Sequence, residues 1–456
     1  MGATGKRRVG MTAAVIIAAL AVCIAAALAW YVGNSRHGEE RDLAKAVAAG
    51  FVEKRARVEV SLAGEATGSM IEAVVNYAEG PDNGPALVLV HGQGMQWEDY
   101  ARVLPDLAQR YHVFAVDCFG HGESSHDPAL YSCEAIGRAF KSFAAQKIGA
   151  CYLVSGHSSG GIIAAWLAAN DAEQVTACVL EDPPFFRVTP VEMQQEPGCF
   201  AWKDGFMVTH AFLRQGDVAD PTVYYAQHSY LFSLFGGLQP KIAEWTAQER
   251  SANPDAHLTL AWVPHDWVRG LYFYDDFDVR FSETFYDGTW FDGIDQADLL
   301  RCITCPAVYL KAKTNYGEDG TLLAANSDED AARVQQLVAV CETVVVESGH
   351  DIHYERPKTF ADAVDRAASV ASAKEPRPTA AFSAIEALVE GERRFHHDVD
   401  IEARGDESPC GWRPCGPSGA PTLRKRSPPS IRWRRSTRAP RAAPPRTARE
   451  PVRCRR

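Results

Sequence analysis

Short apolar runs alternate with longer amphipathic stretches between residues 57 and 372. Runs of four to eight apolar residues are typical of strands buried on both faces, whereas a 3.6-residue apolar period is typical of helices. This alternation predicts an α/β fold, with a mostly parallel sheet covered by helices on both faces. The predicted strands are residues 58–62, 71–77, 86–90, 113–116, 151–154, 175–180, 307–310 and 343–346. The predicted helices are residues 98–109, 133–146, 159–170, 328–340 and 357–372.

The alternation stops between Pro183 and Asp298. This stretch contains 23 of the 45 aromatic residues of the chain. Aromatic side chains bury large areas, so they either pack a core of their own or form an apolar substrate chamber. We therefore predict a mainly helical lid insertion over residues 183–298, between the two parts of an α/β core at residues 57–182 and 299–372.

The N-terminal part contains an uncharged apolar run at residues 11–32. At about 1.5 Å per helical residue, a helix of this length would cross a bilayer. Basic residues at 6–8 precede the run, which by the positive-inside rule predicts an extracytoplasmic body. The small-residue motif at 27–29 is instead compatible with a cleaved signal peptide and a secreted body. We predict a membrane anchor (transmembrane helix) or signal segment at 1–35, and a helical stalk at residues 36–56.

Charge is distributed unevenly along the chain. Residues 401–456 hold 15 Lys and Arg against 4 Asp and Glu, whereas residues 1–400 hold 32 against 54. The acidic body disfavours nucleic acid as a partner. We interpret residues 373–456 as a linker and a basic, Pro/Arg-rich disordered tail, because they lack a periodic apolar pattern. Such a tail is compatible with binding to anionic polymers or lipid headgroups, with simple solvation, and with an out-of-frame translation.

A candidate nucleophile follows the predicted strand 151–154. The sequence there is Gly156-His157-Ser158-Ser159-Gly160, and an Ala-rich helical stretch comes next. A G-x-S-x-G motif between a strand and a helix is typical of a nucleophile elbow, a sharp turn that exposes the serine hydroxyl. Ser158 is therefore the candidate nucleophile, and the Ser159 N–H is a candidate oxyanion donor. Alone, the motif is also compatible with a small-residue turn of no catalytic function.

Two further loops complete a recognisable pattern. The sequence HGQG lies at residues 91–94 and DCFGHGES at residues 117–124, each directly after a predicted strand. With GHSSG, these motifs resemble the α/β-hydrolase superfamily in order and spacing, and the resemblance covers about residues 57–372. It implies an eight-stranded sheet with a lid after the sixth strand, and a structural role for 117–124. The Gln93 N–H is the expected second oxyanion donor, with Gly94 as the alternative. The residues expected to line or buttress the site are His91, Gly92, His121 and His157.

The candidate general base is His350, which follows the last predicted strand. Imidazole titrates near neutral pH, so it can accept the serine proton and return it to a leaving group. His353 is the alternative. The family's usual acid position falls near Asn315, which cannot carry a negative charge. The acid therefore stays open among three residues, which are Asp182, Asp319 and Glu181.

These features predict a serine hydrolase, and favour a carboxylesterase that cleaves an apolar or amphipathic acyl ester through an acyl-enzyme on Ser158. Hydrolysis of C–C, thioester or amide bonds, perhydrolysis, and a membrane-anchored ligand-binding protein with little turnover remain open alternatives. We expect no cofactor and no metal, because Cys302-x-x-Cys305 lacks the second ligand pair of a structural zinc site. The expected partners are a small apolar ester and a membrane contacted by the N-terminal segment.

Overall fold

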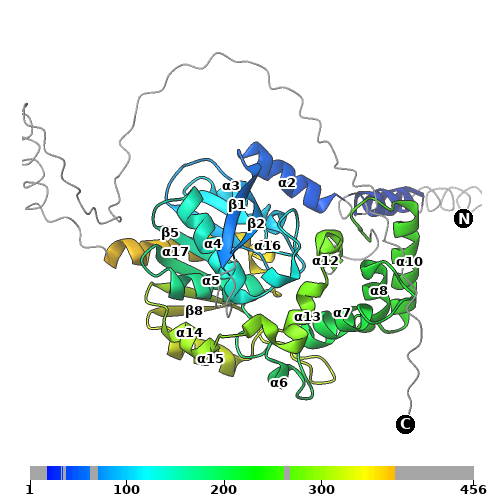
Figure 1. Ribbon diagram of the computed structural model, residues 1–456. Helices are drawn as coiled ribbons and strands as arrows, with labels where there is room; N and C mark the ends of the chain where they lie inside the picture. The colour runs from blue at the N-terminus through cyan, green and yellow to red at the C-terminus, as the bar shows by residue number, and fades with distance from the viewer. Residues whose placement is uncertain (1–17, 32, 34–36, 62–69, 261–267, 375–456) are drawn as a thin grey trace, which may run out of the picture. The chain divides into compact units, whose positions relative to one another are not determined.

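The computed structural model describes residues 18–31, 33, 37–61, 70–260 and 268–374 (Figure 1). An eight-stranded sheet with strand order β1-β2-β4-β3-β5-β6-β7-β8 forms the centre. The predicted eight-stranded α/β sheet is confirmed, and it is mixed because β2 runs antiparallel to both β1 and β4. The strands are β1 (Val52–Ser61), β2 (Met70–Glu79), β3 (Ala86–Val90), β4 (His112–Val116), β5 (Tyr152–His157), β6 (Val175–Glu181), β7 (Ala307–Ala312) and β8 (Cys341–Val346).

Two apolar cores cover the two faces of the sheet. Alternate residues of β3 divide between them, since successive side chains of a strand point to opposite faces. Val88 and Val90 belong to the core that contains α4 (Cys133–Lys147) and α5 (Ser159–Asn170). Leu87 and Leu89 belong to the core that contains α3 (Leu104–Leu107) and α17 (Pro357–Lys374). Burial on both faces explains why β3 appears in the sequence as an uninterrupted apolar run.

The segment between β6 and β7, residues 182–306, contains a series of short helices. Several of them, α8, α10 and α12 among them, lie together beside the sheet (Figure 1). Seven buried residues from this segment form a third core: Ala226, Phe232, Ile242, Leu258, Leu260, Val268 and Leu271. Its helices are α6 (Pro190–Met193), η3 (Ala201–Phe206, a π-helix), α7 (Met207–Phe212), α8 (Pro221–His228), α9 (Tyr230–Ser233), η4 (Gly236–Leu238), α10 (Gln239–Ala252), α12 (Gly270–Phe273), η5 (Tyr274–Asp276), α13 (Arg280–Asp287), η6 (Thr289–Phe291) and α14 (Gln296–Arg301).

Two local predictions differ from the structure. The range predicted as a helical stalk contains α2 (Gly38–Ala48) but also the first residues of β1. The outer part of β1 is exposed, so its apolar alternation starts only at Ala56 and the strand appears shorter in the sequence. The helix predicted over 98–109 is divided into η1 (Trp97–Tyr100) and α3. The remaining helices are η2 (Pro128–Leu130), α15 (Asp328–Leu337) and α16 (Ile352–Glu355).

The prediction of a transmembrane helix near the N-terminus is wrong. No helix within the described ranges is long and apolar enough to cross a membrane. Residues 11–17 and 32 of the predicted run lie outside the described residues, as does the predicted tail from residue 375 onward.

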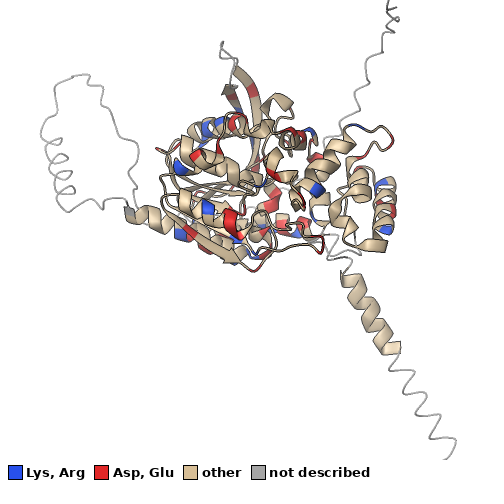
Figure 2. Ribbon diagram, turned by 90° about the horizontal axis from the view of Figure 1, so that it is seen from below, with Lys and Arg blue, Asp and Glu red and all other residues tan. Residues whose placement is uncertain are grey.

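Charged residues of both signs lie on the described helices. Figure 2 shows Lys and Arg interspersed with Asp and Glu, and neither sign forms a continuous face over the described residues in this view. Many of them form ion pairs, such as Arg138 with Glu134 along α4 and Lys358 with Asp362 along α17. Exposed pairs of this kind contribute at most about 1 kcal/mol each to stability.

Candidate active site

Ser158 lies in the sharp turn between β5 and α5, with its side chain half-buried. Its φ of +53° and ψ of −124° are uncommon for a residue with a Cβ atom. The Ser158 N–H donates to the Glu181 carbonyl oxygen at 2.9 Å, which ties the turn to the end of β6. A Cβ atom on Gly160 would lie 2.3 Å from the Val90 oxygen, so only glycine permits this close crossing. A turn of this shape holds the serine hydroxyl away from the sheet.

His350 and Asp182 form a hydrogen-bonded pair at the same edge of the sheet. The distance from His350 Nδ1 to Asp182 Oδ2 is 2.7 Å. The Asp182 side chain is fully buried, whereas that of His350 is 37% exposed. The Asp182 N–H donates to the Leu310 oxygen, and its Oδ1 accepts the Ala312 N–H at 3.1 Å. The carboxylate is thus fixed between β6 and β7, and it holds the imidazole by Nδ1, which leaves Nε2 for chemistry.

The other two acid candidates have different partners. The Asp319 side chain is 46% exposed and contacts Lys203, Thr321 and Tyr230. The hydrogen bonds from Thr321 and the Lys203 ammonium lower the pKa of Asp319 below its usual range. The Glu181 carboxylate accepts hydrogen bonds from His353, at 2.6 Å from the backbone N–H and 2.8 Å from Nδ1. Of the three candidates, the structure brings Asp182 to His350.

The electrostatic environment of His350 is set by its acid partner. Desolvation alone would lower the pKa of His350, but the hydrogen bond and the negative charge of Asp182 outweigh it. The pKa of His350 is therefore raised above its usual value of 6.5. A raised pKa makes the imidazole a stronger base and stabilises the imidazolium that forms when it accepts a proton.

The loop after β3 packs directly against the nucleophile turn. A Cβ atom on Gly92 would lie 2.8 Å from His157 Nδ1 and 3.0 Å from Ser158 Cβ. The Gly94 N–H donates to His121 Nε2 at 3.0 Å, so this group is already engaged. The backbone N–H groups of Gln93 and Ser159 remain the candidate oxyanion donors, and that of Ser159 belongs to the first turn of α5, where helical N–H groups lack intrahelical partners.

Three buried histidines brace these loops. His91 Nδ1 donates to the Gly92 oxygen at 2.7 Å, and its Nε2 accepts the Cys118 N–H at 2.9 Å. Burial lowers the pKa of His91 to about 4 and that of His121 well below the usual range, so both are neutral at pH 7. His157 Nε2 lies 3.2 Å from the His350 carbonyl oxygen, which links the nucleophile turn to the loop of the base. These rings hold the loops in place from the interior, and His91 is fully buried.

Asp117 organises the turn at residues 117–124. Its carboxylate accepts hydrogen bonds from Asn76 Nδ2 at 2.8 Å and from the Trp97 N–H at 2.7 Å. A Cβ atom on Gly122, whose φ is +51°, would lie 2.2 Å from Asp117 Oδ2. Burial raises the pKa of Asp117 to about 7 despite these hydrogen bonds. The contacts are those of the structural turn that the family resemblance implies.

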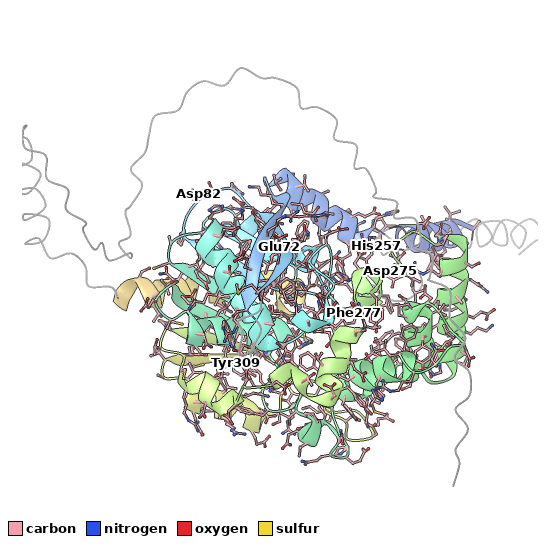
Figure 3. The ribbon with its side chains drawn as sticks, viewed as in Figure 1. Glu72, Asp82, His257, Asp275, Phe277 and Tyr309 are labelled. Carbon is pink, nitrogen blue, oxygen red and sulfur yellow. The ribbon has the colours of Figure 1, made fainter. Side chains whose placement is uncertain are left out.

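A cavity of about 220 Å³ lies between the β3 loop and the segment from β6 to β7. Its lining is mostly apolar and includes Gln93, Gly94, Phe200, Asp204, Tyr225, Leu231, Leu271, Tyr274 and Phe277. Phe277 lies between α12 and α13, as the side-chain view shows (Figure 3). The buried Asp204 carboxylate accepts hydrogen bonds from the Tyr225 hydroxyl and the Leu231 N–H, and burial raises its pKa to about 6. Sequence reasoning missed Asp204, because a single Asp among aromatic residues carries no motif.

A buried ionic network lies behind the candidate site. Arg269, only 2% exposed, donates to Glu39 at 2.6 Å and to the carboxylate of Asp99. Asp99 Oδ2 is 3.2 Å from His353 Nε2, and His353 Nδ1 in turn contacts Glu181. Sequence reasoning missed Arg269, Asp99 and Glu39, since their pairing joins residues 170 to 230 positions apart.

The sequence model of the alpha/beta hydrolase family matches residues 87–363, which is more than half of the chain, so the chain belongs to that family. The resemblance noted in the sequence is thereby confirmed at the level of the superfamily. The fold and the hydrogen-bonded His350–Asp182 pair agree with this assignment.

Individual relatives match over shorter stretches. Bifunctional epoxide hydrolase 2 of Sus scrofa is 34% identical over 119 residues, or 24% of this chain and 21% of that protein. The pimeloyl-(acyl-carrier protein) methyl ester esterase of Nitrosomonas europaea is 36% identical over 104 residues, or 23% of this chain and 39% of that protein. The chain thus matches about a fifth to two fifths of the length of these relatives. A solved membrane phospholipase A, described as a bacterial virulence factor, is 19% identical with a TM-score of 0.47, over 80% of this chain and 99% of that one.

Proposed function

We propose that this protein is a serine esterase that cleaves a carboxylic ester through an acyl-enzyme on Ser158. The observation that carries the proposal is the 2.7 Å contact between His350 Nδ1 and the buried carboxylate of Asp182. This pair lies at the sheet edge where the strained Ser158 turn is tied to β6. A serine, a histidine and a buried acid so arranged are the parts that acyl transfer requires.

The proposed reaction has two halves. Ser158 Oγ attacks the ester carbonyl while His350 Nε2 accepts its proton, and the N–H groups of Gln93 and Ser159 stabilise the oxyanion. His350 then returns the proton to the leaving alcohol, and water releases the acyl group by the same steps. No hydrogen bond of Ser158 Oγ is found among the described residues, so the serine and the base must align when substrate binds.

The cavity beside Gln93 supports a substrate whose acyl group is apolar or amphipathic, because that group would bind in the cavity. Its lining is predominantly apolar, and each buried methylene contributes about 0.8 kcal/mol of binding. We expect p-nitrophenyl octanoate to be hydrolysed with a kcat/KM at least about tenfold above that of the acetate. A steady-state series of p-nitrophenyl esters of rising chain length measures this preference.

Gly270 offers a direct test of the cavity, because it lines the cavity and a Cβ atom there meets nothing within 4 Å. The Gly270→Phe variant should lose the preference for long acyl chains and keep acetate hydrolysis. Gly237→Phe is the matched control, since Gly237 also faces open space but does not line the cavity. A wild-type enzyme that prefers acetate would contradict this substrate class while leaving esterase activity intact.

The pH dependence of ester hydrolysis should follow the protonation of His350. The protonated imidazole cannot accept the serine proton, so kcat/KM should fall as the pH is lowered through the pKa of His350, which lies above 6.5. Removing the charge of Asp182 in Asp182→Asn lowers that pKa, so the midpoint of the residual activity should move to lower pH. A pH–rate profile of both proteins measures the shift, and an unchanged or higher midpoint would exclude this pairing.

A further inference from the structure

Three buried side chains from separate elements converge behind the nucleophile turn. Asp99 lies in η1, His157 at the end of β5 and His353 in α16, and all three are at most 2% exposed. Each offers one ligand atom, and these atoms lie within 4.8 Å of one another. The group plays no part in the proposed ester hydrolysis, in which His350 is the base.

The hydrogen bonds of the two histidines favour tautomers that direct lone pairs into this cluster. His353 Nδ1 faces Glu181 Oε1 at 2.8 Å, and His157 Nε2 faces the His350 carbonyl oxygen at 3.2 Å. Both partners only accept hydrogen bonds, so these ring nitrogens carry the protons when the rings are neutral. The opposite nitrogens, His353 Nε2 and His157 Nδ1, then hold lone pairs.

Three buried polar atoms, Asp99 Oδ2, His157 Nδ1 and His353 Nε2, have no hydrogen-bond partner outside the cluster. Asp99 Oδ2 and His353 Nε2 face one another, whereas His157 Nδ1 has no hydrogen bond. Buried acceptors without a donor are costly, so such a group calls for a positively charged occupant. Asp99 Oδ2 and His353 Nε2 lie 3.2 Å apart, close to the roughly 3.3 Å expected for two ligands of a tetrahedral ion with metal–ligand bonds of about 2.0–2.1 Å.

The charges around the cluster favour a divalent cation. Arg269 binds the Asp99 carboxylate from the far side, and its own charge is offset by Glu39 at 2.6 Å. Asp351 lies 3.4 Å from His157 Nε2 and 4.0 Å from Arg269, so the negative charges of Asp99, Glu181 and Asp351 remain beside the two histidines, and one divalent ion would offset two of the three. The contacts of Arg269 with Asp99 and of Glu181 with His353 are of the kind that orients metal ligands from behind.

We propose that Asp99, His157 and His353 bind one divalent transition-metal ion, with zinc favoured by the two-imidazole, one-carboxylate ligand set. The three ligands are buried, and a water molecule would complete the tetrahedral coordination, so we assign the ion a structural role. It joins η1, the turn that carries Ser158 and the helix that follows His350, and so holds the two catalytic loops together. The alternative occupant is a proton on His353 Nε2. Desolvation lowers the pKa of His353, but the negative charges of Glu181 and Asp99 outweigh it and raise that pKa to about 10 in the metal-free protein.

Metal titration of the full chain distinguishes the two occupants. Protein stripped with 1,10-phenanthroline should bind one equivalent of Co²⁺ with the visible absorption of a tetrahedral site, and Zn²⁺ should displace it. Saturation with Zn²⁺ at about 100 times its Kd should raise Tm by about 5 °C. A chain that binds neither ion and whose Tm does not respond to Zn²⁺ overturns the proposal in favour of the proton, whatever its esterase activity.

Variants locate the ion. His353→Gln and Asp99→Asn should lose the cobalt spectrum and the stabilisation by Zn²⁺. His112→Gln should keep both, because His112 pairs with Glu79 at the edge of β4, outside the cluster. If Asp99→Asn does not fold, the comparison of cobalt binding by His353→Gln and by the wild-type protein decides the question. Equal cobalt binding by wild type and His353→Gln would overturn the proposal, since the ion would then lie elsewhere in the chain.

Discussion

Replacing Ser158 with Ala is expected to lower kcat/KM for p-nitrophenyl esters by about 10,000-fold or more. The variant has no hydroxyl to attack the carbonyl, so only the oxyanion donors and the binding cavity can assist an attack by water. Steady-state hydrolysis of a p-nitrophenyl ester measures the loss, and the circular dichroism spectrum checks that the variant is folded.

Ser155→Ala is the matched control for this loss. Ser155 lies on β5, the strand that leads into the Ser158 turn, is fully buried, and its hydroxyl has no hydrogen-bond partner. Removing that hydroxyl leaves the turn and the imidazole untouched, so activity should change less than about threefold. A folded Ser158→Ala enzyme that keeps more than a tenth of wild-type activity would exclude Ser158 as the nucleophile.

The second large effect is expected at Asp182. Asp182→Asn should lower kcat by about 1,000-fold to 10,000-fold, because an amide in this place can donate to His350 Nδ1 and favour the tautomer whose Nε2 is protonated. That tautomer cannot accept the proton of Ser158. The other carboxylate oxygen accepts the Ala312 N–H at 3.1 Å, so the amide oxygen of Asn should keep this contact and turn its NH2 group toward His350.

Asp319→Asn is the matched control for the acid, since it makes the same chemical change in the competing loop. The Asp319 side chain is 46% exposed and pairs with Lys203, away from the His350–Asp182 hydrogen bond. The activity of Asp319→Asn should therefore change less than about threefold, measured in the same steady-state assay as that of Asp182→Asn. The reverse pattern, with Asp319→Asn inactive and Asp182→Asn active, would assign the acid to the loop after β7.

Much of the fold could be predicted because its central strands are buried on both faces. The residues of β3, β5 and β7 are almost entirely buried, so each of these strands contains a short continuous apolar run. The Ser158 turn could also be predicted from the sequence, because its glycines are required by contacts within a few residues and with the β3 loop.

The sequence could not identify which acidic residue pairs with His350. Asp182 and Asp319 both follow strands that end at the same sheet edge, and spacing alone does not separate them. The choice depends on the pairing of β6 with β7, in which the Asp182 N–H donates to the Leu310 oxygen. That contact turns the buried Asp182 side chain toward His350, whereas the longer loop carries Asp319 to Lys203.

Two other features show why local patterns were insufficient. The length of the apolar run at 11–32 and the basic residues before it predicted a membrane span, but no helix among the described residues is long and apolar enough to be one. Arg269 lies in no motif, and arginine is rarely buried, so nothing in the sequence pointed to its position. Its burial depends on Glu39 and Asp99, which are 230 and 170 positions away along the chain.

The most direct test of the central claim is to map the residue that reacts with a fluorophosphonate probe by peptide mass spectrometry. We predict one modification per chain, on the peptide that contains Ser158, absent in Ser158→Ala and slowed in Asp182→Asn. Modification of another residue, or an unlabelled wild-type protein that still hydrolyses esters, would contradict the assignment of Ser158 as a nucleophile activated by His350.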